Sequence, residues 1–233
     1  MQIRAILFDA GNTLVWLDHD FILSALAEVG VATTSAALLE AEYEAKRGID
    51  RRIREGRGGT DESRARRYFA EVLRGVGLQE AHFPAVAEVL EARHAERNLW
   101  RAVREHTAET LEELRRRGYR LGVVSNADGR VDALLTEVGL RDYFDVVVDS
   151  GVEGVEKPDP RIFRIACERM GVAPQEAAYV GDIYEIDVVG ARAVGMQAYL
   201  VDPLMRWGDL DCDRIAALPD LLARFPALEA ANV

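Results

Sequence analysis

The chain has 233 residues and a formal net charge of −11; 49% of the residues are hydrophobic and 30% are charged. These values exclude a disordered chain, and the acidic balance argues against a nucleic acid partner. The sequence has no apolar run of the roughly 18 residues that a membrane span needs, and it does not begin like a signal peptide. Cys167 and Cys212 lie in unrelated segments without metal-ligand spacing, so we expect reduced thiols in a cytoplasmic protein.

The first predicted element is a strand, an apolar run over residues 3–8 that ends at Asp9. From about residue 20 to residue 100 the pattern becomes helical and contains no convincing strand. Four helices are expected in this block: residues 20–29, residues 35–54 after a Ser35 cap, a third after a Thr60 cap, and a fourth from Pro84 to about residue 98.

After residue 100, short apolar runs alternate with helical segments. Strands are predicted at residues 121–124, 146–148, 179–180 and 198–201, and helices at residues 107–117, 131–138, 160–170 and 188–194. This alternation predicts an α/β fold with a doubly wound, Rossmann-like parallel sheet. The first strand belongs to that sheet, so the helical block is an insertion. We expect a discontinuous core of residues 1–15 and 101–233 and an all-helical domain of residues 16–100.

Polar side chains gather where the predicted strands end, which is the edge at which open parallel sheets bind ligands. Several carboxylates, a hydroxyl and a lysine from separate strands make a site for a hard cation and a phosphate. The residues concerned are Asp9, Ser125, Asn126, Lys157, Asp182 and Asp187. Lys46 is the only other lysine in the chain.

Four segments resemble, in the same order, the four motifs of the haloacid dehalogenase superfamily of hydrolases. They are Phe8-Asp9-Ala10-Gly11-Asn12-Thr13-Leu14, Val123-Val124-Ser125-Asn126, Lys157-Pro158, and Gly181-Asp182 with Asp187. The inserted helical block is similar to the mainly helical, C1-type cap domain of that family. The motifs and the cap together cover residues 8–191.

The resemblance implies a Mg²⁺-dependent phosphatase that acts on a small phosphorylated metabolite. Asp9 would attack phosphorus and form an aspartyl-phosphate that water hydrolyses, and Lys157 would neutralise the charge of the nucleophile and the phosphoryl group. The implied Mg²⁺ ligands are Asp9, the Gly11 carbonyl, Asp182 and Asp187. The implied phosphate-binding residues are Asn12, Thr13, Ser125 and Asn126.

One residue departs from the family pattern. Phosphatases of the family usually carry a second aspartate two residues after the nucleophile, and this chain has Gly11 there. That aspartate protonates the leaving alcohol, and a positioned general acid typically contributes about 10²–10⁴-fold. The next residue, Asn12, tolerates a left-handed backbone, so we expect the loop shape to persist without the acid.

Three hypotheses follow from this departure. The chain is a phosphatase with an acid from elsewhere or with a substrate that needs little protonation; His19 is the best substitute by chemistry, and a solvated linker residue is its plainer interpretation. Alternatively it cleaves carbon–halogen or carbon–phosphorus bonds. The metal-binding fourth motif argues against dehalogenation. Cleavage of a phosphonate requires a cap lysine that forms a Schiff base; Lys46 is the only candidate, and we expect it to be solvated. The third hypothesis is a catalytically weak relative that binds a ligand or partner.

Residues 46–67 of the insertion carry a local excess of positive charge. Nine basic and four acidic side chains give this segment a charge of 9 − 4 = +5. Either part of the segment attracts an anionic substrate, or it forms exposed helices with local ion pairs.

Overall fold

The computed structural model describes residues 2–229. The chain divides into two compact units, one made of Met1–Trp16 and Val103–Val233 and the other of Leu17–Ala102. Within the described residues, no helix is both long and apolar enough to cross a membrane. The first of these units is the core, and the second is the insertion.

The core contains a six-stranded parallel sheet in the order β5-β4-β1-β6-β7-β8, which confirms the predicted fold class. Its strands are β1 (Ala5–Phe8), β4 (Arg120–Ser125), β5 (Val146–Asp149), β6 (Ala177–Gly181), β7 (Gln197–Val201) and β8 (Asp213–Ile215). The sequence did not predict β8, because the strand has only three residues and the first two are charged, which leaves no apolar run or alternation to recognise.

The central strand β1 is completely buried, with all four side chains at 0% exposure. Strands of parallel sheets are apolar throughout because helices cover both faces, which explains the continuous apolar run. Phe8 pairs with Val123 of β4 and with Val180 of β6. The carboxyl ends of these three strands therefore lie side by side, and the polar residues that follow them meet at one edge.

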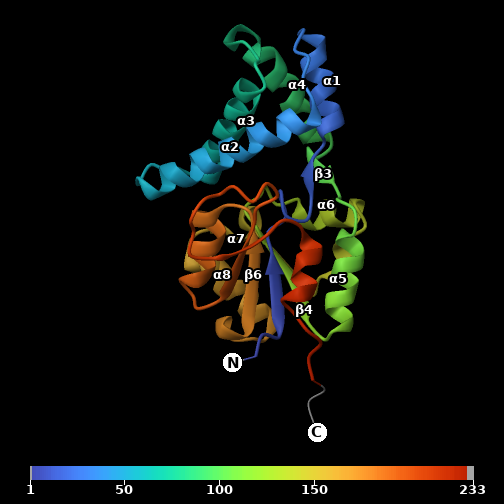
Figure 1. Ribbon diagram of the computed structural model, residues 1–233, viewed down its shortest axis with the longest axis vertical. Coiled ribbons are helices and arrows are strands. Elements are labelled where there is room, and N and C mark those ends of the chain that lie inside the picture. Colours follow the sequence, from blue (N-terminus) through green and yellow to red (C-terminus); the bar gives the residue numbers. More distant parts are fainter. Residues whose placement is uncertain (1, 230–233) are drawn as a thin grey trace. The chain divides into compact units, whose positions relative to one another are not determined.

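Helices pack on the core sheet, with α5 and α8 on opposite sides of it (Figure 1). The core helices are α5 (Thr107–Arg116), α6 (Val131–Glu137), α7 (Ser150–Glu153), α8 (Pro160–Met170) and α9 (Val189–Arg192). Short helical turns cover Arg141–Tyr143, Pro174–Glu176 and Leu218–Ala223. The helix expected at residues 188–194 begins earlier, with a π-helical turn over Tyr184–Val188.

The insertion is helical, as predicted. It contains α1 (His19–Glu28), α2 (Ser35–Arg54), α3 (Asp61–Gly75) and α4 (Phe83–Glu96), with a 3₁₀ turn at Glu80–His82. At its ends, β2 (Trp16–Leu17) and β3 (Trp100–Ala102) pair with each other. Thr60 caps α3 as predicted, but Thr34 and not Ser35 caps α2, because its hydroxyl accepts from the Ala37 N–H at 3.2 Å.

Two expectations for the insertion are wrong. Lys46 is not solvated: it is 2% exposed and lies on one face of α2 between the buried Glu42 and Asp50, four residues to either side. His19 is not a solvated linker residue. Its Nε2 lies 2.5 Å from Glu42 Oε1, and its Nδ1 lies 2.5 Å from Ser35 Oγ. The spacing of four residues between Glu42, Lys46 and Asp50 is also typical of a solvated polar helix face, so the sequence pattern did not reveal that Lys46 is buried.

Candidate active site

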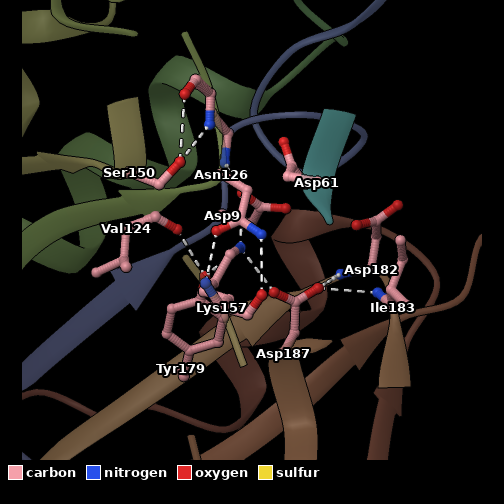
Figure 2. Close-up of polar contacts among 12 residues, drawn as sticks. Asp9, Asp61, Val124, Asn126, Ser150, Lys157, Tyr179, Asp182, Ile183 and Asp187 are labelled. Carbon is pink, nitrogen blue, oxygen red and sulfur yellow. Dashed lines mark hydrogen bonds and ion pairs between the residues drawn. The ribbon is translucent and has the colours of Figure 1, made fainter. Parts of the chain in front are cut away.

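The carboxyl edge of the sheet brings Asp9, Lys157 and Asp187 into direct contact (Figure 2). The Lys157 ammonium lies 2.9 Å from Asp9 Oδ1 and 2.8 Å from Asp187 Oδ1. Asp9 directly follows β1, and its backbone N–H donates to the Val180 carbonyl of β6 at 2.8 Å. Segments from opposite ends of the chain thus meet because their strands are neighbours in the sheet.

Lys157 is buried, at 1% exposure, and a side chain of the neighbouring loop holds its backbone. The Lys157 N–H donates to Asn126 Oδ1 at 2.7 Å, and Asn126 Nδ2 donates to the Lys157 carbonyl at 3.0 Å. Asn126, which the sequence assigned to phosphate binding, therefore uses its side-chain amide to anchor the lysine loop.

Asp9, Asp182 and Asp187 form a group that fits a divalent cation. One carboxylate oxygen from each lies within 4.8 Å of the others. Asp182 and Asp187 are 3% and 1% exposed, and carboxylate oxygens are the ligands that Mg²⁺ prefers. Asp187 Oδ2 also accepts from the backbone N–H groups of Asp182 and Ile183, both at 2.9 Å, which fixes the loop that follows β6.

The electrostatics of this group also favour a bound cation. Burial raises the pKa of Asp9 to about 7; the Lys157 charge opposes this, and the charges of Asp187 and Asp182 add to it. Burial alone lowers the pKa of Lys157, but the charges of Asp187 and Asp9 outweigh it and raise that pKa well above its ordinary value. Three carboxylates face one lysine, so the cluster holds negative charge that a bound cation relieves.

The residues after Asp9 form a tight turn beside the cluster. Gly11 lies in this turn, and Asn12 has a left-handed backbone with φ of 51°, as the sequence predicted. The Asn12 N–H donates to the Val15 carbonyl at 2.7 Å. Thr13 is 1% exposed, and within the described residues its hydroxyl has no hydrogen-bond partner. A buried hydroxyl in this state is available to a ligand.

Ser125 ends β4 and is 4% exposed, next to a loop that Asp149 organises. Asp149 Oδ1 accepts from the Gly129 N–H at 3.0 Å and Oδ2 accepts from the Val131 N–H at 3.1 Å. Ser150 Oγ accepts from the Ala127 N–H at 3.0 Å. These contacts fix the backbone that follows Ser125.

The sequence reasoning missed Asp149 and Tyr179. The Tyr179 hydroxyl accepts from Lys157 Nζ at 2.9 Å and donates to the Val124 carbonyl at 2.7 Å. Asp149 ends a strand of three valines and Tyr179 lies inside a strand of apolar residues and glycine; a polar group in such an apolar run is the signal that could have found them.

Comparisons with known proteins agree with this geometry. Residues 3–195 match the family model of haloacid dehalogenase-like hydrolases. The chain is 34% identical over 247 residues to haloacid dehalogenase-like hydrolase domain-containing protein 3 of Homo sapiens, covering 98% of this chain and 95% of that protein. It is 34% identical over 198 residues to a glyceraldehyde 3-phosphate phosphatase of Methanopyrus kandleri, covering 84% and 82% of the two chains.

A solved structure of a HAD phosphatase from Thermococcus onnurineus superposes with a TM-score of 0.60 at 26% identity, covering 97% of this chain and 100% of that one. The sheet order and the helical insertion after the first strand are thus accompanied by similarity along most of the sequence. The chain belongs to the haloacid dehalogenase-like hydrolase family.

Proposed function

We propose that the protein is a Mg²⁺-dependent phosphatase of small phosphorylated metabolites, with Asp9 as the nucleophile. The observation that carries the proposal is the cluster in which Lys157 bridges Asp9 and Asp187 while Asp182 completes a group of three carboxylates. The similarity to a glyceraldehyde 3-phosphate phosphatase supports a small phosphorylated substrate. The two cysteines form no disulfide, which is compatible with a location in the reducing cytoplasm.

In this proposal Asp9, Asp182, Asp187 and the Gly11 carbonyl hold the ion. Bound there, Mg²⁺ offsets the repulsion between the Asp9 carboxylate and an incoming phosphate. Lys157 holds Asp9 in place through its 2.9 Å contact. Thr13, Ser125 and the backbone N–H of Asn126 bind the phosphoryl oxygens, while the Asn12 N–H holds the turn through the Val15 carbonyl.

The reaction has two steps. An Asp9 carboxylate oxygen forms a bond to phosphorus, and the bond from phosphorus to the leaving oxygen breaks with its electron pair. Water then attacks the phosphorus of the aspartyl-phosphate, and the bond from phosphorus to the Asp9 oxygen breaks with its electron pair. The water loses a proton to solvent, inorganic phosphate leaves, and the Asp9 carboxylate is restored. Gly11 has no side chain to protonate the leaving oxygen, so substrates with stable leaving groups should react fastest.

The first test compares acetyl phosphate, p-nitrophenyl phosphate and an alkyl phosphate, with Mg²⁺ and with EDTA. We expect Mg²⁺-dependent turnover that is fastest with acetyl phosphate, because its leaving carboxylate needs no proton. Asp9→Asn should abolish turnover, and Asp142→Asn, at an exposed aspartate that is not part of the cluster, should retain it.

Adding a phosphonate and a haloacid to these substrates tests the other hypotheses. Mg²⁺ binding without turnover of any phosphate indicates a binding protein. Cleavage of a phosphonate, with Lys46 trapped by borohydride reduction, indicates carbon–phosphorus hydrolysis. Release of halide from a haloacid indicates dehalogenation. Asp9→Asn with full phosphatase activity contradicts the assignment of the nucleophile.

A further inference from the structure

Tyr179 contacts the lysine of the site but belongs to none of the motifs that identified it. It lies in the middle of β6, between the apolar residues of a strand that is buried along its whole length. Its side chain is 0% exposed, and its ring packs edge-on against Phe163 of α8, with ring centroids 5.1 Å apart. The ring is therefore held on a rigid part of the core.

The hydroxyl of Tyr179 has a defined hydrogen-bond direction. The Val124 carbonyl, 2.7 Å away, can only accept, so the phenol proton points to it. The phenol oxygen is then free to accept from Lys157 Nζ at 2.9 Å, as Figure 2 shows. The Val124 carbonyl of β4 thus orients the phenol, and the oriented phenol oxygen is the third hydrogen-bond acceptor of the Lys157 ammonium.

We propose that Tyr179 is a positioning residue that fixes the Lys157 ammonium toward Asp9 and Asp187. An ammonium group has three N–H donors, and here it has three acceptors: Asp9 Oδ1, Asp187 Oδ1 and the Tyr179 hydroxyl, at 2.9, 2.8 and 2.9 Å. All three N–H bonds are directed, so the ammonium group does not rotate freely. The catalytic part of this inference rests on the function proposed above.

A lysine needs such a third contact more than an arginine does. Its ammonium is a point charge on a flexible four-carbon chain, and nothing in the group itself selects a direction. Without the phenol, one buried N–H of Lys157 would lose its acceptor, and the ammonium would tilt between the two carboxylates. Directed donors matter most for a charge that has to meet a transferring phosphoryl group.

The test uses the fact that Lys46 and Lys157 are the only lysines of the chain. Protein labelled with lysine that carries ¹⁵N at Nζ gives two side-chain signals, and the one that is absent in Lys157→Arg belongs to Lys157. In the wild-type protein we expect a shifted Lys157 signal whose protons exchange slowly with water. A hydrogen bond to a charged group is stronger than one between neutral groups, so Tyr179→Phe should speed this exchange tenfold or more.

The matched control is Tyr199→Phe. Tyr199 is also a buried tyrosine, at 3% exposure, on the neighbouring strand β7, and its hydroxyl contacts Gln197 instead of the lysine. This variant removes a hydroxyl of the same kind and should leave the Lys157 signal and its exchange rate unchanged. Tyr179→Phe should also lower kcat on p-nitrophenyl phosphate about tenfold and leave KM within about twofold, because the ammonium is needed most when the phosphoryl group moves.

Several results would overturn the proposal. The proposal is overturned by the wild-type protein alone if the ammonium protons of Lys157 exchange with water as fast as those of free lysine. An unchanged Lys157 signal in Tyr179→Phe, or an equal change in Tyr199→Phe, overturns it as well. Unchanged kcat in Tyr179→Phe removes the catalytic role. If the wild-type protein hydrolyses no phosphate, the proposed function fails, while the exchange measurements still decide whether Tyr179 positions Lys157.

Discussion

At the scale of single residues, Gly181 illustrates how the absence of a side chain builds the site. A Cβ at this position would lie 2.3 Å from Asp187 Cγ and 2.5 Å from Asp187 Cβ. The Asp187 carboxylate therefore occupies the space that any other residue would fill. From there it reaches Lys157 with one oxygen and the backbone N–H groups of the next loop with the other. The glycine is needed for close approach and not for an unusual backbone angle.

We predict that Gly181→Ala weakens Mg²⁺ binding. The added methyl group displaces Asp187, and loss of a group that orients metal ligands lowers metal affinity by about 10–100-fold. The measurement is the Mg²⁺ concentration that gives half-maximal hydrolysis of acetyl phosphate. Gly48→Ala is the matched control, because its Cβ would meet only the flexible end of the Glu71 side chain. Equal Mg²⁺ requirements in Gly181→Ala and the wild-type protein would contradict this role.

At the scale of elements, α2 and α3 of the insertion explain the positive segment of the sequence. Four of its arginines form ion pairs with acidic residues of the same segment: Arg54 with Asp50, Arg57 with Glu55, Arg64 with Asp61 and Arg66 with Glu62. The interpretation as exposed helices with local ion pairs therefore describes Arg54 and Arg66, whereas Arg57 lies beyond the end of α2 and Arg64 is only 6% exposed. Glu42 has a different role, because it is 1% exposed and joins α1, through His19, to α3, through the Tyr68 hydroxyl at 2.9 Å.

We predict that Glu42→Ala lowers the free energy of unfolding by about 2 kcal/mol or more, since removing a buried acceptor leaves its donors unsatisfied. Urea denaturation followed by circular dichroism measures the change. Glu44→Ala is the control: Glu44 is exposed and pairs with Arg47 at 3.0 Å on the surface, where an ion pair contributes at most about 1 kcal/mol. Similar losses in the two variants would show that Glu42 does not link the helices.

At the scale of the whole molecule, the net charge of −11 and the buried carboxylates make stability depend on pH and on metal. The pKa of Asp9 rises from 3.8 to about 7 on folding, mainly because of burial, with Lys157 opposing the rise and Asp187 and Asp182 adding to it. The folded protein therefore binds an additional proton between these pH values. As the pH rises through this window, Asp9 must ionise in the fold, and stability falls.

We predict that the metal-free wild-type protein becomes less stable relative to Asp9→Asn as the pH rises from 4 to 8. One pKa unit corresponds to about 1.4 kcal/mol, so the full change is at most about 4 kcal/mol. Thermal unfolding of both proteins in EDTA across this range checks it, and Mg²⁺ should restore stability to the wild type at pH 8. Parallel pH profiles of the two proteins would show that Asp9 titrates normally.

The sequence by itself determined the alternation of strands and helices, the helical insertion after the first strand, and the polar residues at the strand ends. These features are local: the periodicity of apolar residues, helix caps and the residues that follow a strand are all readable within a few positions. The left-handed Asn12 belongs to this class, since its backbone depends on residue type and turn. The family motifs are local for the same reason.

Only the tertiary structure decided which of these residues touch. The contacts of Lys157 with Tyr179 and Asp187 join segments 22 and 30 residues apart, and those of His19 with Glu42 span 23. Lys46 on a polar helix face carried no sign that it would be 2% exposed. Burial and long-range pairing are set by how strands and helices pack together, and no window of neighbouring residues contains that information.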